Sequence, residues 1–216
     1  MAQIFSKQLN LALRAGVPVL LLGALGAAGI FAYFADPKVA DVGYAPTQPV
    51  PYSHKLHAGN LGMDCRYCHS TVEKAAYAAI PSAEVCMNCH HRVRAESRVL
   101  QPIRDAYAYP DQPVGWVKIH RLPDYVYFNH SAHVTAGVSC VSCHGRVDQM
   151  VVVEQVQPLS MAWCLECHRN PAPNIRPTEF VTKLDWQPEG DPAELGRRLI
   201  AEKHINPPEN CSGCHR

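Results

Sequence analysis

Hydrophobic residues are concentrated near the start of the chain. Residues 16–35, GVPVLLLGALGAAGIFAYFA, form a run of twenty residues without a charged side chain. At 1.5 Å per residue, a helix of this length is about 30 Å long, which matches the hydrocarbon core of a bilayer. The pattern therefore predicts a transmembrane helix over residues 16–35.

The charges on either side of this run predict its orientation. Lys7 and Arg14 precede the run and Asp36 follows it. By the positive-inside rule, residues 1–15 are expected in the cytoplasm of a bacterial cell and the rest of the chain on the periplasmic or outer face of the inner membrane. The alternative is a cleaved export signal, but its apolar stretch is usually only about 7–15 residues. We expect an uncleaved, single-pass signal anchor.

The rest of the chain has a different pattern. Proline-rich stretches such as residues 169–177 and 205–210 predict loops and short helical turns. The best candidate for a longer helix is 191–204, with Asp191 as N-cap and Pro192 at the first helical position. We expect residues 36–51 to form an extended linker. Residues 52–216 are expected to form one mostly irregular domain with small α-helices and little sheet.

The ten cysteines all lie in five copies of the pentapeptide C-x-x-C-H. This is the attachment signature of c-type haem, in which two thiols bind the porphyrin and the following imidazole is the proximal iron ligand. Zinc sites of four cysteines would leave one of five pairs over, and neither zinc nor disulfides explain the repeated histidine. The sequence predicts five covalently bound haem c groups on Cys65, Cys68, Cys86, Cys89, Cys140, Cys143, Cys164, Cys167, Cys211 and Cys214, with proximal ligands His69, His90, His144, His168 and His215.

An internal repeat organises these motifs. Residues 52–69 and 128–144 both contain an aromatic residue, one further residue, H-x-x-H, a short loop and C-x-x-C-H. A second haem motif follows each of them. The repeat predicts two similar structural units, at about 52–91 and 128–169, with a fifth haem appended at 204–216.

Seven histidines remain after the five proximal ones are assigned. Surplus imidazoles next to haem motifs are expected to bind iron at the sixth position. His54, His57, His130 and His133 are the leading candidates, and His204 and His120 compete for the remaining place. His91, Met161 and Met150 are weaker candidates, since a methionine is more often a flexible filler of apolar space.

The segment VYFNHSAH, followed by CVSCHG, resembles the multihaem cytochrome c3/c7 class. The resemblance implies that the first histidine of H-x-x-H ligates the haem attached just downstream. His54 would then serve the haem on Cys65 and Cys68, and His130 the haem on Cys140 and Cys143. The second histidine crosses to another haem in that class, which implies that His57 and His133 serve the haems at 86–90 and 164–168.

The whole chain resembles a narrower family. The anchor, SHKLHAG, MDCRYCH, VCMNCH, LSMAWCLECHR and HINPPENCSGCHR together are similar to the pentahaem cytochrome c subunit of bacterial alternative complex III. The resemblance implies a non-catalytic electron-transfer subunit of a quinol-oxidising complex. Electrons would come from an iron–sulfur subunit and leave to a cytochrome c, a copper protein, a terminal oxidase or a photosynthetic reaction centre.

Two other functions stay open on the sequence. A multihaem quinol dehydrogenase of the NapC/NirT type shares the anchor-plus-haem plan, although the H-x-x-H repeat and the fifth haem favour the first interpretation. A multihaem oxyanion reductase needs an iron with an open face, whereas here candidate ligands outnumber irons. The formal net charge of +1 gives no reason to expect nucleic acid as a partner.

Overall fold

The structure is a computed structural model that describes residues 4–215. The chain divides into two compact units, with the boundary between Asp41 and Val42. The first unit contains α1 (Lys7–Ala35) and the short α2 (Pro37–Ala40). The second unit contains all five C-x-x-C-H motifs.

Helix α1 contains the predicted apolar run but begins earlier, at Lys7. The Ser6 hydroxyl caps it by accepting a hydrogen bond from the backbone N–H of Leu9 at 3.2 Å. None of its residues is buried within the chain, and by length and composition α1 is able to cross a membrane. It ends at Ala35, and the carboxylate of the next residue, Asp36, caps α2 by accepting from the N–H of Lys38 at 2.9 Å.

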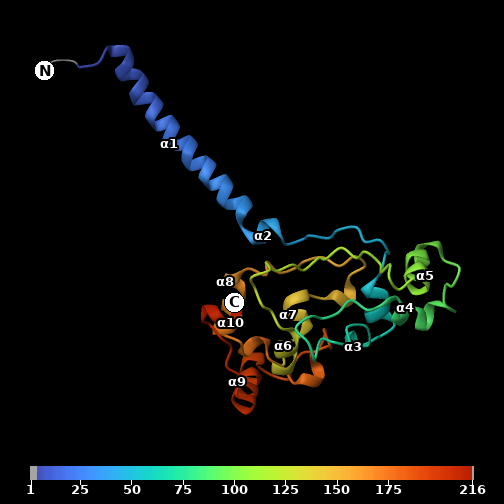
Figure 1. Cartoon of the computed structure of the whole chain (residues 1–216). Coiled ribbons are helices and arrows are strands. Elements are labelled where there is room, and N and C mark those ends of the chain that lie inside the picture. Colours follow the sequence, from blue (N-terminus) through green and yellow to red (C-terminus); the bar gives the residue numbers. More distant parts are fainter. Residues whose placement is uncertain (1–3, 216) are drawn as a thin grey trace. The chain divides into compact units, whose positions relative to one another are not determined.

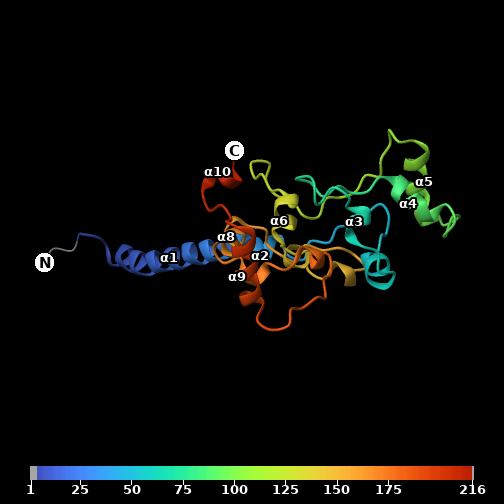
Figure 2. The same ribbon diagram turned by 90° about the horizontal axis from the view of Figure 1, so that it is seen from below.

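The second unit is built from short helices joined by irregular chain (Figure 1). Its helical segments are η1 (Lys55–Asn60), α3 (Cys65–Cys68), α4 (Ala83–His90), η2 (Arg98–Leu100), α5 (Gln101–Ala108), α6 (His130–Ala136), α7 (Cys140–His144), η3 (Val147–Gln149), α8 (Met161–Arg169), η4 (Ala172–Asn174), η5 (Thr178–Phe180), α9 (Pro192–Lys203) and α10 (Cys211–Cys214). Both views place α4 and α5 at one end of this unit and α8 and α10 at the other (Figures 1 and 2).

Sheet structure is nearly absent from residues 4–215. Only two isolated antiparallel bridges occur there, between Val126 and His215 and between Val138 and Ile175. The protein core is equally small: Val72, Val134 and Val181 form one buried cluster. The predicted fold class, mostly irregular with short helices and little sheet, is confirmed.

The structure bears directly on two predicted segments. Helix α9 starts as predicted, with Pro192 at its first position and the Asp191 carboxylate accepting from the N–H of Ala193 at 2.9 Å. Part of the expected linker lies against the domain, because the N–H of Gly43 donates to the carbonyl of Gln155 at 2.7 Å. Helix α5 was not predicted; it buries Ile103 and Ala106 and lies against α4.

Candidate haem-binding sites

The cysteine pairs are presented by single helical turns. Helices α3, α7 and α10 begin at the first cysteine of a motif, and the side chain of the preceding residue caps each of them. In α4 and α8 the motif occupies the C-terminal part of the helix instead. Because residues three apart lie on one face of a helix, each turn directs its two thiols to the same side. Below, the sites are numbered one to five in the order of the motifs along the chain.

Four of the five expected proximal histidines share one hydrogen-bond pattern. Their Nδ1 atoms lie 2.7–3.2 Å from backbone carbonyl oxygens. Because a carbonyl can only accept, Nδ1 must carry the proton, and the lone pair of Nε2 is left free for a metal. The pairs are His69 with Ala79, His90 with Val93, His168 with Pro208 and His215 with Tyr125. His144 differs, since its Nδ1 lies 3.2 Å from Nε2 of His120.

Three of the four H-x-x-H imidazoles follow the same pattern. Nδ1 of His57, His130 and His133 lies 2.7–2.9 Å from a backbone carbonyl oxygen. The fourth, His54, has a buried Nδ1 without a hydrogen-bond partner. Burial, with His69 and His57 nearby, lowers the pKa of His54 to about 4, so the ring is neutral at physiological pH. A neutral imidazole is the form that binds iron.

The spacing of the rings fits imidazole pairs that share one metal. The ring centroids are 6.2 Å apart for His57 and His90, 6.4 Å for His130 and His144, and 6.0 Å for His133 and His168. With nitrogen–metal bonds of about 2 Å on both sides and a further ~1 Å from nitrogen to ring centre, trans ligands have centroids roughly 6 Å apart. The residues therefore fit a six-coordinate haem iron at each of these three sites.

In each H-x-x-H segment, the aromatic residue two positions before it contacts both histidines in the same way. Tyr52 meets His54 edge-on, with centroids 4.8 Å apart, and stacks on His57 at 4.4 Å. Phe128 meets His130 edge-on at 4.7 Å and lies over His133 at 4.4 Å. The two units of the predicted repeat thus share a local geometry. The aromatic residue two positions before H-x-x-H is the sequence signal for it.

The exposure of the ten cysteines varies: Cys89 and Cys211 are exposed, and the other eight are partly buried. All ten cysteines, which lie in the described part of the chain, are outside disulfides. Burial raises the pKa of the Cys143 thiol to about 12. Within residues 4–215, no three His, Cys, Asp or Glu side chains converge as ligands of one metal ion.

The other candidate ligands occupy varied positions. His204 follows α9 with a left-handed backbone, φ 53°, and is exposed. His91 is also exposed, and its Nδ1 lies 2.6 Å from the carbonyl of Met87 in its own helix. Met161 opens α8 with its side chain 62% exposed. Met150 follows η3, and its carbonyl accepts from the N–H of Lys55 at 2.9 Å.

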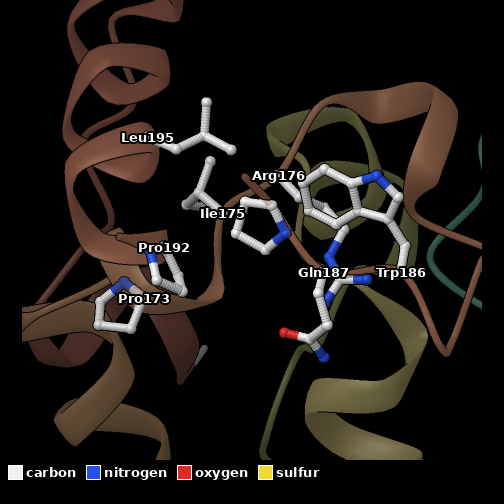
Figure 3. A pocket seen from close by; sticks show the side chains of 8 residues that line it. Pro173, Ile175, Arg176, Trp186, Gln187, Pro192 and Leu195 are labelled. Atoms are coloured by element: carbon white, nitrogen blue, oxygen red, sulfur yellow. The ribbon is translucent and has the colours of Figure 1, made fainter. Parts of the chain in front are cut away.

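A small cleft lies between α9 and the chain at 173–188 (Figure 3). Its volume is about 90 Å³, and Ile175, Arg176, Trp186 and Leu195 are among its lining residues. The guanidinium carbon of Arg176 lies 5.2 Å from the ring centre of Trp186, a cation–π contact. The cleft is too small for a macrocycle.

Comparison with known proteins gives two findings. Residues 50–103 match the family described as cytochrome c7 and related cytochrome c. The chain is 29% identical over 182 residues to the menaquinone reductase, multiheme cytochrome c subunit, of Nitratidesulfovibrio vulgaris strain Hildenborough. That alignment covers 78% of this chain and 77% of the relative.

Fold, motifs and comparisons agree on the class of protein. The second unit is a multihaem cytochrome c7-like domain that binds haem c covalently, and its function is electron transport. Sequence reasoning missed the contact between His120 and His144, which are 24 residues apart and share no motif.

Proposed function

We propose that this chain is a five-haem electron relay and that each C-x-x-C-H motif is one haem site. The observation that carries the proposal is the spacing of 6.0–6.4 Å between the imidazoles of three ligand pairs. The proximal ligands are His69, His90, His144, His168 and His215. The haems are bound through Cys65, Cys68, Cys86, Cys89, Cys140, Cys143, Cys164, Cys167, Cys211 and Cys214.

The same ring spacing supports our assignment of the sixth ligand at three of the five sites. His57, His130 and His133 serve the second, third and fourth sites. His54 serves the first site, which is supported by the influence of His69 on its pKa. For the fifth site we assign His204, whose positive φ is an unusual backbone state for a residue other than glycine.

Haem iron, when bound, supplies a one-electron redox centre. The protein's own contribution is to fix the ligands. Carbonyl oxygens hold the protons on Nδ1 of His57, His130 and His133, so that each Nε2 faces its site. Stacking on Tyr52 and Phe128 restricts ring rotation, which keeps the ligand geometry similar in both oxidation states. Small reorganisation on electron exchange is what a relay requires.

We propose further that the relay works within a membrane complex that exchanges electrons with quinones. The relative's name, a menaquinone reductase subunit, supports this context. Residues 16–35 would anchor the chain in the bacterial inner membrane, with residues 1–15 in the cytoplasm, 36–51 as the connection and 52–216 on the periplasmic face. The finer proposal is alternative complex III, with an iron–sulfur subunit as donor and a cytochrome c, copper protein, oxidase or reaction centre as acceptor.

The relative also favours a second candidate, in which electrons run towards the quinone. A menaquinone reductase delivers electrons to menaquinone, opposite to the direction in a quinol-oxidising complex. The haem sites are the same in both cases. The direction is set by the partners and by the potentials of the haems.

One experiment tests the site assignment and the direction. The complex is purified from its native membrane, and the haem content of this chain is measured by intact mass and by pyridine haemochrome. Stopped-flow absorbance then follows the haems after addition of a quinol, or of a quinone to the pre-reduced complex. Five haems per chain and rapid reduction by quinol support the relay in the quinol-oxidising direction. Oxidation by quinone alone supports the second candidate, and fewer than five haems contradicts the site assignment.

A further inference from the structure

The five motifs follow one another in space in an order that differs from the sequence. The second and first sites are neighbours, because Nδ2 of Asn88, inside the second motif, donates to the hydroxyl of Tyr67, inside the first, at 3.1 Å. The H-x-x-H segment joins them as well. His54 is assigned to the first site. Three residues further, the ring centroid of His57 lies 6.2 Å from that of His90 of the second site.

The first site is next to the third. The sulfur of Cys65 lies 4.0 Å from the carbonyl oxygen of Thr182, and the backbone N–H of Cys140 donates to the carbonyl of the neighbouring Val181 at 3.3 Å. One segment ties both motifs together, since the hydroxyl of Thr182 donates to Asp64 at 2.9 Å and the buried Ser139 hydroxyl donates to the carbonyl of Val181 at 2.7 Å. These contacts join the two halves of the repeat at their first motifs.

The third and fourth sites are joined by the second H-x-x-H segment. The ring centroid of His130 lies 6.4 Å from that of His144 of the third site. The ring centroid of His133, one helical turn further, lies 6.0 Å from that of His168 of the fourth site. His168 in turn leads to the fifth site, because its Nδ1 bonds to the carbonyl of Pro208 at 2.7 Å. Arg169 also pairs with Glu209 at 3.3 Å, two residues before Cys211.

Both views of the domain show the same progression. In Figure 1 the motif helices run from α4 through α3 and α7 to the end that holds both α8 and α10, and Figure 2 shows α4, then α3, and then α8 and α10 together at the far end. The two exposed cysteines are Cys89, in the second motif, and Cys211, in the fifth. They belong to the two motifs at the ends of the row.

We propose that electrons cross the chain in the order second, first, third, fourth and fifth site, or the reverse. The second and fifth sites are then the two ends at which redox partners exchange electrons with this subunit. This inference rests on the proposed five-haem relay. It goes beyond that function by naming which motifs face the partners and by making the first motif an internal site.

The order is tested by injecting electrons at the fifth site of the haem-loaded full chain. Asn206 is exposed and lies five residues before Cys211, so N206C provides a position for a ruthenium photoreductant. Two variants then open one iron each, His54→Ala at the first site and His57→Ala at the second. Carbon monoxide holds the opened iron in its ferrous form, which removes that site from electron exchange. The readout is the number of haems reduced in the fast phase after a flash.

In the proposed order, His54→Ala removes two haems from the fast phase, because the second site lies beyond the first. His57→Ala removes one. The reverse result, with two haems lost in His57→Ala and one in His54→Ala, would show that the sites work in sequence order and would overturn the proposal. Haem content and static redox titration of the unlabelled chain report separately on the five-haem relay itself, so the two failures are distinguishable.

A different observation carries a second inference, on the surroundings of the third site. Among the five expected proximal histidines, His144 bonds through Nδ1 to a side chain, Nε2 of His120 at 3.2 Å. The two rings are nearly perpendicular, with centroids only 4.3 Å apart. That separation leaves no room for an iron between them, whereas His130 faces His144 at 6.4 Å.

We infer that His120 is a positioning residue for His144 and not an iron ligand. Nε2 of His120 accepts the proton of Nδ1, which orients the ring of His144 and increases the basicity of its Nε2. A more basic proximal ligand stabilises ferric iron, so this contact lowers the potential of the third site alone. Because the hydrogen-bond partner of His144 is a side chain and not a backbone carbonyl, a substitution at position 120 can change the potential of the third site without changing the other sites.

The test compares His120→Ala with His120→Asn, whose amide oxygen can also accept a hydrogen bond. His91→Ala is the matched control, since His91 is exposed and bonds only within its own helix. EPR-monitored redox titration should show one haem shifted to higher potential in His120→Ala, with all haems still low-spin, and a smaller shift in His120→Asn. A new high-spin haem in either variant would make His120 a ligand and overturn the inference. Unchanged potentials in both variants would overturn it equally.

Discussion

The rings of His130 and His144 lie parallel to within 7°, with their centroids 6.4 Å apart. They are held from different parts of the chain. His130 opens α6, and its Nδ1 bonds to the carbonyl of Ala76 in the first half of the domain, at 2.8 Å. His144 closes α7 and bonds to His120. The third site therefore depends on contacts from three separate segments.

Removal of the His130 imidazole should open the third site. We expect His130→Ala to convert one haem from low-spin to high-spin and to create one site for carbon monoxide, because among residues 4–215 no second imidazole faces His144 at ligand spacing. EPR and optical spectra of the purified protein measure both changes. His91→Ala should leave the spectra unchanged. A low-spin spectrum in His130→Ala would remove His130 from the ligand set.

The residue that stacks on the second histidine of each H-x-x-H should need a ring but not a hydroxyl. Phe128 takes in the second unit the place that Tyr52 has in the first. We expect Tyr52→Phe to be nearly neutral and Tyr52→Leu to lower the free energy of unfolding by about 1 kcal/mol through loss of the ring contacts. Denaturant titrations of the two variants give the comparison. Equal destabilisation by both would assign the effect to the hydroxyl.

The motifs made much of the domain predictable from sequence. Helices α3, α7 and α10 begin at the first cysteine of C-x-x-C-H, because the residue immediately before it, Asp64, Ser139 or Asn210, is a good helix cap. Asp191 and Pro192 marked the start of α9 for a similar local reason. The aromatic residue before H-x-x-H was visible in the repeat, and its stacking follows from the spacing.

Contacts between distant segments were not predictable in this way. Thr182 bonds to Asp64 across 118 positions, and neither residue belongs to a recognisable pattern. The contact between His120 and His144 and the helix α5 were missed for the same reason, since packing and not local sequence produces them. The spatial order of the motifs depends on such contacts, so it could be inferred only from the structure.

The Asp64 carboxylate should stabilise the first motif in a pH-dependent way. The hydrogen bonds of the Arg66 guanidinium hold the pKa of this carboxyl well below its usual value of 3.8. A depressed pKa means that the stabilisation is present above the unfolded-state pKa and is lost as the pH falls through and below that value. Asp64→Asn keeps an N-cap acceptor but removes the charge, so at pH 7 we expect a loss below about 1 kcal/mol, as for partly exposed ion pairs.

The difference between wild type and Asp64→Asn should shrink as the pH falls below about 4, where the Asp64 carboxyl of the unfolded chain begins to be protonated while that of the folded chain is still ionised. Urea titrations at neutral and acidic pH measure it. Asp64→Ala, which removes the cap as well, should cost about 1 kcal/mol more than Asp64→Asn at both pH values. A difference between wild type and Asp64→Asn that does not change with pH would mean that the charge is not responsible.

The packing of α9 on η4 should depend on a glycine. A Cβ atom at Gly196 would collide with the backbone carbonyl of Ala172, which cannot turn aside as a flexible side chain could. We expect Gly196→Ala to lower the free energy of unfolding by about 1–3 kcal/mol, although alanine alone favours a helix over glycine by about 1 kcal/mol. Gly115→Ala is the control, because nothing lies within 4 Å of its added Cβ.

Gly196→Ala should also change the potential of the fourth haem site, because η4 contacts that site. Asn174 ends η4 and its side-chain amide donates to the sulfur of Cys167 at 3.7 Å. Displacement of η4 by the new methyl group should therefore shift the potential of one haem in Gly196→Ala and of none in Gly115→Ala, as measured by redox titration. Unchanged stability and potentials in Gly196→Ala would mean that α9 does not pack on η4 in the folded protein, since this contact leaves no space for a methyl group.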